Sequence, residues 1–345
     1  MMFRNQSGGV EKLKNKAPYY SIIVTAYNIE KYITTCIESI KGQTFENYEC
    51  IVVDDGSDDK TDLMINKAIA GDSHFVYFKT AHFGQAHARN TGLKVSRGKY
   101  VLFADGDDTL IGNCLSACKE KAEACDMLIF GINYQEYGAE KRISEWPLKI
   151  KAIEFSSGSK LIDWYVVNYA LPSHSASNTG ITDDLSATVL LNSAANKVYK
   201  RSVLEKSDIH FDENVAYGED RIFNFDFLRV SGKIKVLPDI YYNYRRINPS
   251  SITQKFRSHS IDQDLYLHDL KMRCILELSK NTAPSELEAF ERFDLDCAIR
   301  HALRHIKDHT DILSKDVLAD EYRYLTSRIL VNNSLQPMPK TGDTR

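Results

Sequence analysis

Short apolar runs alternate with helical periodicity from about residue 18 to residue 125, and this alternation constrains the fold more than any other feature of the chain. The runs YYSIIVTAY, ECIVVDD, HFVYFK and KYVLFAD are typical of buried strands. Between the first two runs, five apolar residues recur at helical spacing and give a helix one face for a sheet: Ile29, Ile33, Cys36, Ile37 and Ile40. Strands that alternate with helices predict an α/β fold, with a mostly parallel central sheet flanked by helices.

The rest of the chain divides into a looser stretch and a helical end. A strand-like run, DMLIFGINY, is followed later by the polar stretch PSHSASNTGITDDLS, which predicts a long loop, either a lid over a site or an ordinary surface excursion. After Ser260, three segments have helical periodicity: IDQDLYLHDLKMRCILELS, SELEAFERFDLDCAIRHALRHI and DVLADEYRYLTSRILV. We therefore predict a flexible tail at 1–17, an α/β domain at 18–255 that divides near residue 125, an α-helical region at 256–331 and a flexible tail at 332–345.

The composition excludes several classes of protein. The 44 lysine and arginine residues nearly balance the 47 acidic residues, so that no basic field favours a nucleic-acid partner. The seven cysteines contain no Cys-x-x-Cys pair, and we expect most of them to be buried thiols in a reducing cytosol. The N-terminal stretch lacks the apolar segment of a secretory signal, and no run of about 18 apolar residues is present in the sequence. We therefore expect a cytoplasmic protein that does not span a membrane.

Polar residues gather where three of the expected strands end. They are Thr25, Tyr27 and Asn28 after the first strand, Asp54 and Asp55 after the second, and Asp105, Gly106, Asp107 and Asp108 after the fourth. In an open α/β sheet the carboxyl ends of parallel strands share one edge, where ligands bind. The sequence therefore predicts that these distant residues converge in one acidic pocket.

The Asp-x-Asp pair is the strongest chemical signal. On an extended segment, alternate side chains point to the same side, so Asp105 and Asp107 could reach one ligand, with Gly106 allowing a close backbone approach. Two hard oxygen ligands suit Mg²⁺ or Mn²⁺, which complete their coordination with water and phosphate oxygens. The alternative is a simple acidic turn, because Asp and Gly are common turn formers. The crowding of several carboxylates at one edge favours the metal, since a bound cation relieves their repulsion.

Seven motifs together resemble the inverting glycosyltransferases of family 2, which have the GT-A fold. In family order they read SIIVTAYNIEKYI, QTFENYECIVVDDGSDDKT, GQAHARNTGL, GKYVLFADGDD, NKVYKRSVL, YGEDRIFNF and YYNYRRINPSSI. They cover roughly Tyr19 to Thr253, and as a set they are specific, although each one alone would be weak. The resemblance implies that the α/β domain is catalytic, with a nucleotide-binding half at 18–125 and an acceptor half at 126–255.

The resemblance also implies a nucleotide-sugar donor, commonly one that contains uracil. Thr25, Tyr27 and Asp55 would hold the base. Asp105 would hold the ribose, and Asp107 would coordinate the metal that bridges the two phosphates. Arg89 would lie near the donor's diphosphate or sugar, unless it is a structural arginine paired with an acid at the sheet edge. The full set expected to bind the nucleotide is Thr25, Ala26, Tyr27, Asn28, Glu30, Asp54, Asp55, Gly56, Arg89, Asp105 and Gly106.

The segment Gly218-Glu219-Asp220 resembles the family's acidic motif that carries the catalytic base. Inverting transfer requires one carboxylate to take the proton of the acceptor hydroxyl, and we assign this role to Asp220, with Glu219 as its neighbour or alternate. Glu and Asp also favour the first turn of a helix, and both interpretations can hold together. Further implied contacts are Arg245, Arg246 and Ser250 at the diphosphate, as a lid, and Asn196 and Lys197 near the acceptor.

Two features of the motifs narrow the activity. Where the family often has Asn-x-Gly, this chain has His82-Phe83-Gly84, which leaves the sugar-side contacts open. A Gln-x-x-Arg-Trp motif is absent, which favours the transfer of one sugar per encounter over polymerisation. By resemblance the acceptor is a glycan, such as a surface or capsular polysaccharide, a lipid-linked oligosaccharide or a lipopolysaccharide core, reached by peripheral association with the inner face of the membrane.

Two other functions compete with glycosyl transfer. A nucleotidyltransferase that makes sugar nucleotides shares the α/β layout, but it usually has a glycine-rich phosphate loop where this chain reads TAYNIEKY. A catalytically silent scaffold or glycan-binding subunit is the second alternative, against which the acidic residues weigh.

Three histidines are spaced by four residues in the helical region. His301, His305 and His309 could place two imidazoles on one metal ion. A solvated helix face, without a metal, is the simpler interpretation.

Overall fold

The computed structural model describes residues 17–137, 143–144, 152–170, 190–215, 217–245, 256–311 and 313–334. The expected alternation of strands and helices is present in its first part. The four strands are β1 (Tyr20–Ala26), β2 (Tyr48–Asp54), β3 (Phe75–Lys79) and β4 (Tyr100–Asp105). The helices between them are α1 (Ile33–Lys41), α2 (Thr61–Ile69) and α3 (Gln85–Val95).

Six further strands extend the sheet. They are β5 (Thr109–Leu110), β6 (Met127–Tyr137), β7 (Ile143–Ser144), β8 (Ile153–Phe155), β9 (Lys197–Lys200) and β10 (Ile234–Arg245). The strand order is β3-β2-β1-β4-β9-β6-β10-β5, with β7 beside β6 and β8 beside β10. The long strands run parallel, and the short strand β9 runs antiparallel between β4 and β6. The carboxyl ends of the parallel strands therefore share one edge, which confirms the expected α/β fold.

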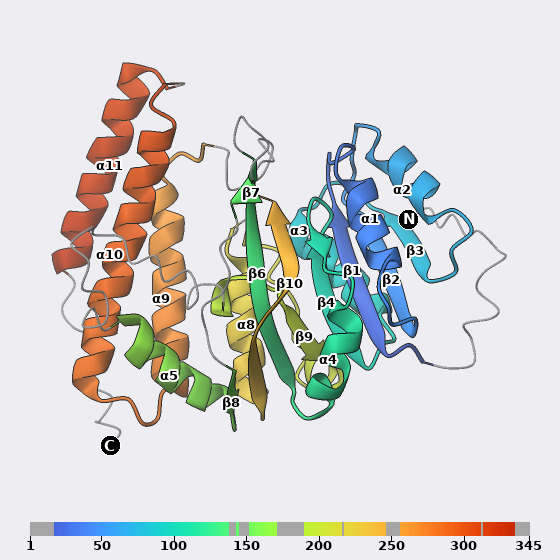
Figure 1. Ribbon diagram of the computed structural model, residues 1–345. Coiled ribbons are helices and arrows are strands. Elements are labelled where there is room, and N and C mark those ends of the chain that lie inside the picture. Colours follow the sequence, from blue (N-terminus) through green and yellow to red (C-terminus); the bar gives the residue numbers. More distant parts are fainter. Residues whose placement is uncertain are drawn as a thin grey trace.

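Helices flank the sheet and form a bundle at one end. The remaining helices are α4 (Cys114–Glu123), α5 (Gly158–Ala170), α7 (Arg201–Lys206), α8 (Glu219–Val230), α9 (Ser260–Leu278), α10 (Pro284–Asp308) and α11 (Lys315–Ser334). Figure 1 shows α9, α10 and α11 side by side at the end of the molecule away from β3. Helix α9 contacts α8 and α5, which lie between this bundle and the sheet. The helical C-terminal region is therefore present as expected.

The hydrophobic core crosses the expected boundary at residue 255. One continuous cluster of buried side chains runs from the sheet into the bundle, where it includes Met272, Ile275 and Phe290. A smaller cluster, which includes Ile261 and Leu325, lies within the bundle alone. The division at residue 255 stays a prediction, and the packing shows that α9 and α10 share the core of the sheet.

Several sequence expectations concern cysteines, membranes and loops. In the described part of the chain, the seven cysteines are free thiols, and all but Cys297 are buried. Among the described helices, none has the length and apolar character required to cross a bilayer. The polar stretch around residues 172–186, expected to be a long loop, lies outside the described residues, as do 1–16 and 335–345 of the two expected tails.

Candidate functional site

A buried arginine joins two distant parts of the chain. Arg89, in α3, is 2% exposed. Its Nη2 donates a hydrogen bond of 3.0 Å to Asp105 Oδ1, at the end of β4. Its Nη1 donates to Glu219 Oε1 at 2.8 Å and to Asp220 Oδ1 at 2.5 Å, in the first turn of α8. One side chain therefore holds the end of β4 against the beginning of α8. We call these four residues the Arg89 cluster.

The Arg89 cluster contains more negative than positive charge, because one guanidinium faces three carboxylates. Burial alone would lower the pKa of Arg89, but Asp220, Asp105 and Glu219 raise it well above its usual value. Burial, with the neighbouring Asp220, raises the pKa of Glu219 to about 7. Burial also raises the pKa of Asp220, although Arg89 opposes the shift. Carboxyl groups with raised pKa values suit proton transfer near neutral pH.

Arg89 was expected either to contact the donor or to pair with an acid at the sheet edge, and the structure contains the pairing, with Asp105. A donor contact by Arg89 stays a prediction.

Strand β10 fixes the turn that follows β4. Asp108 is buried, its Oδ2 accepts a hydrogen bond from the Tyr242 hydroxyl at 2.7 Å, and its Oδ1 accepts one from the Arg245 N–H at 2.7 Å. The Tyr242 hydroxyl in turn accepts the N–H of Asp105 at 3.0 Å. Burial, together with Asp107 and Asp105, raises the pKa of Asp108. The turn therefore holds its acidic residues in fixed positions although their charges repel.

The extended geometry expected for the Asp-x-Asp pair is wrong. Strand β4 ends at Asp105, and residues 106–107 form a turn. Asp105 and Asp107 are nevertheless partly exposed, unlike the buried Asp108. The glycine between them is required, because a Cβ on Gly106 would lie 2.8 Å from the carbonyl oxygen of Thr25. The pair thus reaches the surface from a turn packed tightly on β1, and not from alternate positions of a strand.

The donor set fits a hard divalent cation that takes further ligands from a substrate. Across the described ranges, no group of three or more His, Cys, Asp or Glu side chains is arranged to hold a metal ion. Mg²⁺ commonly binds one or two carboxylates and completes its shell with water and phosphate oxygens. Asp105 and Asp107 can supply such a partial set. Burial raises the pKa of the nearby Cys36, and Asp108, Asp107 and Asp105 raise it further, which shows how much negative charge collects there.

Asp55 anchors the loop that departs from the family pattern. Its Oδ1 accepts the N–H of Phe83 at 2.9 Å, and its Oδ2 accepts the N–H of Gly84 at 2.8 Å and lies 2.7 Å from His82 Nδ1. The His82 ring stacks on the Tyr27 ring, with centroids 4.0 Å apart and planes 9° apart. Both rings are exposed. They form an aromatic surface on which a nucleobase can stack, and the buried Asp55 supports it.

Three other residues expected to bind the nucleotide make bonds within the protein. Asp54 is buried and accepts the N–H of Ser57 at 2.9 Å. The side-chain oxygens of Asn28 and Glu30 each accept a backbone N–H from the loop after β2, at 3.0 Å. These contacts tie the loops after β1 and β2 to each other. A direct nucleotide contact by any of the three stays a prediction.

Small residues let these loops approach closely. Thr25 and Ala26 end β1 and pair in register with β4 and β2. Gly56 has a φ of +75°, and a Cβ there would lie 2.7 Å from the backbone nitrogen of His82. The predicted small residues at these positions therefore bring the loop after β2 against the loop that carries His82.

Asn196 and Lys197, expected near the acceptor, are both fully buried. Asn196 Nδ2 donates to the Phe130 carbonyl at 2.8 Å, and Lys197 Nζ donates to Asn196 Oδ1 at 2.9 Å and to the Ser193 carbonyl. Burial lowers the pKa of Lys197 to about 7. An acceptor does not reach these side chains in this conformation. Their role near the acceptor stays a prediction, and they would influence it only through the residues that they contact.

The same buried segment touches the candidate base. The N–H of Ala194 donates to Asp220 Oδ2 at 3.0 Å. Asn224 Nδ2, in α8, donates to the carbonyls of Leu191 and Ser193 at 2.7 and 3.1 Å. The segment before β9 is therefore bonded to two residues of α8 that lie one turn apart, Asp220 and Asn224.

Of the three residues expected at the diphosphate, only Arg245 lies among the described residues. It ends β10, and its guanidinium carbon lies 4.9 Å from the centre of the Tyr32 ring. Arg246 and Ser250 fall in the range 246–255, outside the described residues. The position of Arg245 beside Asp108 is compatible with a phosphate contact, which stays a prediction.

Of the three spaced histidines, His301 and His305 lie in α10 and His309 directly follows it, and the expectation of a solvated face is wrong for His305. His305 is buried and its Nε2 accepts the N–H of Arg257 at 2.8 Å. His301 Nδ1 lies 3.0 Å from both oxygens of Asp264, and His309 Nδ1 contacts the His305 carbonyl. These are packing contacts between α10, α9 and the segment before α9.

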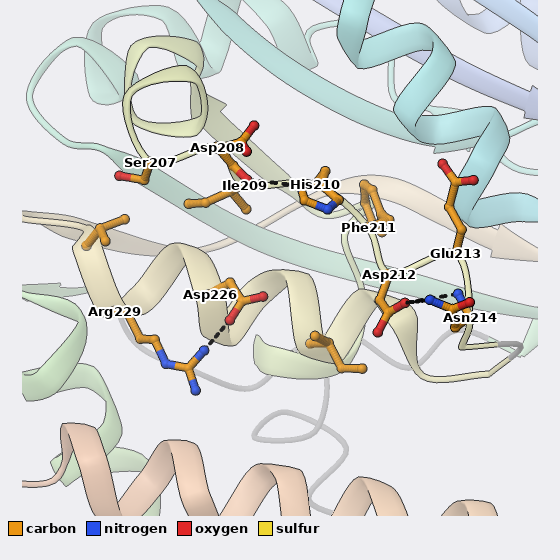
Figure 2. Close-up of a pocket in the computed structure, with 12 residues that line it drawn as sticks. Ser207, Asp208, Ile209, His210, Phe211, Asp212, Glu213, Asn214, Asp226 and Arg229 are labelled. Carbon is orange, nitrogen blue, oxygen red and sulfur yellow. Dashed lines mark hydrogen bonds and ion pairs between the residues drawn. The ribbon is translucent and has the colours of Figure 1, made fainter.

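A hollow of about 710 Å³ lies on the surface beside α8, and the ring centre of Phe211 in its lining lies 5.1 Å from the guanidinium carbon of Arg89. Figure 2 shows that residues 207–214 line one side of it and that α8 lines the other, with Arg229 paired to Asp226 and Asn214 paired to Asp212. None of the residues expected at the site lines this hollow. Its polar groups largely bond to each other, so we assign it no role in the chemistry.

The sequence motifs missed several residues at the acidic edge. Gln85 Nε2 donates to Asp105 Oδ1 at 2.7 Å, and Tyr242 bridges Asp105 and Asp108. Gln85 and Tyr242 both fall inside motifs quoted for the family, which was an available signal. The departure at His82 was also visible, but its stacking on Tyr27 was not, because the two rings come together only in the folded chain.

Comparisons with known proteins agree with this geometry. The family model described as glycosyl transferase family 2 matches residues 21–207, more than half of the chain. The uncharacterized glycosyltransferase EpsJ of Bacillus subtilis is 27% identical over 259 residues, which are 72% of this chain and 67% of EpsJ. The poly(ribitol-phosphate) β-N-acetylglucosaminyltransferase TarS of Staphylococcus aureus is 28% identical over 228 residues, which are 65% of this chain and 35% of TarS.

Solved structures show the same fold. Residues 1–349 of TarS in complex with UDP-GlcNAc align with a TM-score of 0.57 and 22% identity, over 90% of this chain and 82% of that one. A mannosyltransferase from Pyrobaculum calidifontis, in complex with GDP-Man and Mn²⁺, aligns with a TM-score of 0.52 and 16% identity, over 93% of this chain and 88% of the other.

Proposed function

The chain belongs to glycosyl transferase family 2, and from this premise we propose that it transfers a sugar from a UDP-sugar to a hydroxyl of a surface-glycan acceptor, with inversion and with Mg²⁺ or Mn²⁺. Its membership makes it a glycosyltransferase and not a nucleotidyltransferase or a silent scaffold. One observation carries the finer proposal. The guanidinium of Arg89 donates hydrogen bonds both to Asp105, on the proposed donor side, and to Asp220, on the proposed acceptor side.

The donor end of the proposed site lies at β1, β2 and β4. The exposed stack of Tyr27 and His82 offers a flat surface to the base, and Asp55 holds His82 in place. Asp105, at the end of β4, pairs in register with Thr25, two residues before Tyr27, and it is the group proposed to accept a ribose hydroxyl. UDP is supported by TarS, whose structure contains UDP-GlcNAc.

The acceptor end of the site lies at the beginning of α8. Asp220 takes the proton of the acceptor hydroxyl as that oxygen forms a bond to the anomeric carbon. The bond from the anomeric carbon to the diphosphate breaks on the opposite face, and the nucleotide diphosphate leaves with its electron pair. The raised pKa of Asp220 makes it a stronger base than an ordinary carboxylate, and the Ala194 N–H and Arg89 fix its orientation.

Asp107, assisted by Asp105, is the group proposed to hold the divalent cation. Such a cation supplies positive charge beside the leaving diphosphate. The partly exposed pair in the turn after β4 fits this role, because the remaining ligands come from phosphate and water. The mannosyltransferase that shares the fold was solved with Mn²⁺.

We propose that the acceptor is a cell-surface polymer or its lipid-linked precursor, such as a lipid-linked oligosaccharide, and that the enzyme works in the cytoplasm at the inner face of the membrane. Two relatives have names that include such a polymer: TarS, named for poly(ribitol-phosphate), and the minor teichoic acid biosynthesis protein GgaB of Bacillus subtilis, which is 28% identical over 333 residues. The names support a polyhydroxyl acceptor for this chain.

The experiment that tests the proposal screens UDP-, dTDP- and GDP-sugars with Mg²⁺ or Mn²⁺ for nucleotide release in the presence of candidate acceptors. We expect Asp107→Ala to lose metal-dependent donor binding, and Asp220→Asn to bind UDP normally while transfer falls by about 10²- to 10⁴-fold. Asp239→Asn, an exposed carboxylate in β10, is the matched control and should keep full activity. Wild-type transfer by Asp220→Asn would show that another group is the base.

A further inference from the structure

The residues just before the candidate base are held by the C-terminal helices. Gly218 precedes α8 with a φ of +87°, in the left-handed region. A Cβ on Gly218 would lie 2.6 Å from Cδ1 and 2.8 Å from Cδ2 of Leu267, a buried residue of α9. Gln263, one turn earlier in α9, donates a hydrogen bond from Nε2 to the carbonyl of Tyr217 at 3.1 Å. Helix α9 therefore touches both residues that lead into Glu219.

A second set of contacts holds the Tyr217 ring. The guanidinium carbon of Arg257 lies 4.2 Å from the ring centre, and the His301 ring lies parallel to it with centroids 6.1 Å apart. His301 is fixed by Asp264, and the Arg257 backbone is fixed by its bond to His305. His301 and His305 of α10 thus brace the residue that precedes Gly218 and α8, His301 through its ring and His305 through the Arg257 backbone.

The geometry points to a positioning role for the C-terminal helices: we infer that Leu267 and Gln263 of α9 set the place of Glu219 and Asp220 by holding Gly218 and Tyr217. This inference rests on the proposed function for its effect on transfer. The physical contacts do not depend on it.

The inference has a clear physical basis. Asp220 acts only if it lies within hydrogen-bond reach of the acceptor hydroxyl, and a misplacement of about 1 Å can cost about 10²-fold in rate. Arg89 and Ala194 hold the carboxylate itself, but they do not restrain the backbone that enters α8. That restraint comes from α9, because Gly218 has no side chain to separate it from Leu267.

A paired substitution tests the contact directly. Gly218→Ala forces a Cβ against Leu267, and we expect kcat to fall about 10- to 100-fold while KM for the donor stays within about twofold. In the double variant Gly218→Ala/Leu267→Ala the clash is removed although the strain of alanine at a positive φ remains, so we expect kcat to recover only in part relative to Gly218→Ala. Leu267→Ala alone leaves Gly218 unchanged and removes its contact with α9, and we expect it to lower kcat by several-fold. Leu276→Ala, an exposed leucine of the same helix, is the matched control and should leave kcat unchanged. Wild-type kcat in Leu267→Ala would overturn the role of Leu267.

Gln263→Ala gives a readout that is independent of transfer. Amide hydrogen exchange of peptides that cover residues 217–224 should become faster in Gln263→Ala, while peptides of β1 and β4 keep the wild-type rate. Unchanged exchange at 217–224 would overturn the inference for Gln263. If exchange changes as expected but the wild-type protein transfers no sugar from any donor, the proposed function fails and the structural brace stands.

Discussion

Two buried ionic clusters in this molecule are built on opposite principles. In the Arg89 cluster, one cation meets three carboxylates at the edge of the sheet. Between α9 and α10, one carboxylate, Asp294, meets two basic groups: Lys271 Nζ bonds to its Oδ1, and His268 Nδ1 lies 2.8 Å from its Oδ2. We call these three residues the Asp294 cluster. The first cluster has surplus negative charge, and the second has none.

The pKa shifts follow this difference. Although burial opposes the change, Lys271 and His268 hold the pKa of Asp294 well below its usual value. In the Arg89 cluster, burial raises the pKa values of Glu219 and Asp220. A compensated cluster of this kind holds helices together, whereas surplus buried charge costs free energy that folding alone does not require. We therefore assign the Asp294 cluster to structure, and the surplus charge of the Arg89 cluster agrees with the chemical role that we propose for it.

The largest effect is expected from removing the cation of the first cluster. Arg89→Met leaves three carboxylates near one another without a counter-charge, so we expect unfolding free energy to fall by about 3–5 kcal/mol, measured by urea denaturation at pH 8. Transfer should fall by about 10³-fold or more, because Asp105 and Asp220 are no longer held together. The loss of stability should be smaller at pH 5, where protonation relieves the repulsion. Arg300→Met, at an exposed pair with Asp296, should change stability by less than about 1 kcal/mol.

A smaller effect, on stability alone, is expected from the second cluster. Asp294→Asn removes the charge that Lys271 and His268 share, and we expect it to lower the unfolding free energy by about 2–3 kcal/mol. Lys271 limits the loss because burial already lowers its pKa, so that it can become neutral. The kcat of the folded variant should stay within about twofold of wild type in the nucleotide-release assay. A fall in kcat as large as that of Arg89→Met would contradict the division between a chemical and a structural cluster.

The smallest expected effect is the pH dependence of stability that Glu219 gives to the Arg89 cluster. Glu219 has a raised pKa of about 7 in the folded state, so its protonation favours folding; this stability is present at low pH and is lost as the pH rises through about 7. Glu219→Gln should therefore reduce the difference in unfolding free energy between pH 5 and pH 8 by about 1–2 kcal/mol relative to wild type. In the wild-type enzyme, transfer should decline below about pH 7, because the paired carboxyl groups of Glu219 and Asp220 bind a proton. A transfer rate that is flat from pH 5 to pH 8 would argue against a base in this pair.

The fold was largely predictable from local pattern. Each expected strand of the first half lies within one or two residues of its position in the structure, because β1, β2 and β4 are almost entirely buried apolar runs and the turn residues between the strands are strong signals. The C-terminal helices were predictable for the same reason. The shared core was not, because the packing of Met272 and Phe290 against the sheet side depends on contacts between residues far apart in the chain.

The site was predictable in its residue types but not in its contacts. Only the resemblance to the family indicated that Asp105 and Asp220 lie in one site, and their shared bond to Arg89 was not predicted. The turn at residues 106–107 contradicts the extended geometry that was expected from the Asp-x-Asp spacing. The burial of Lys197 could not be anticipated either, since a lysine is seldom fully buried unless it has bonding partners, and its partners come from the chain just before it.

The reversed direction of β9 has a consequence for how such an enzyme diversifies. Its neighbours β4 and β6 run toward the edge of the sheet where Asp220 lies, whereas β9 begins at that edge. Residues 190–196, which precede β9, therefore lie beside Asp220. If Asp220 is the base, as we propose, substitutions in residues 190–196 would alter the surroundings of the acceptor hydroxyl without a change in the pairing of the strands. We expect relatives with different acceptors to differ more in this entry segment than in the strands on either side of it.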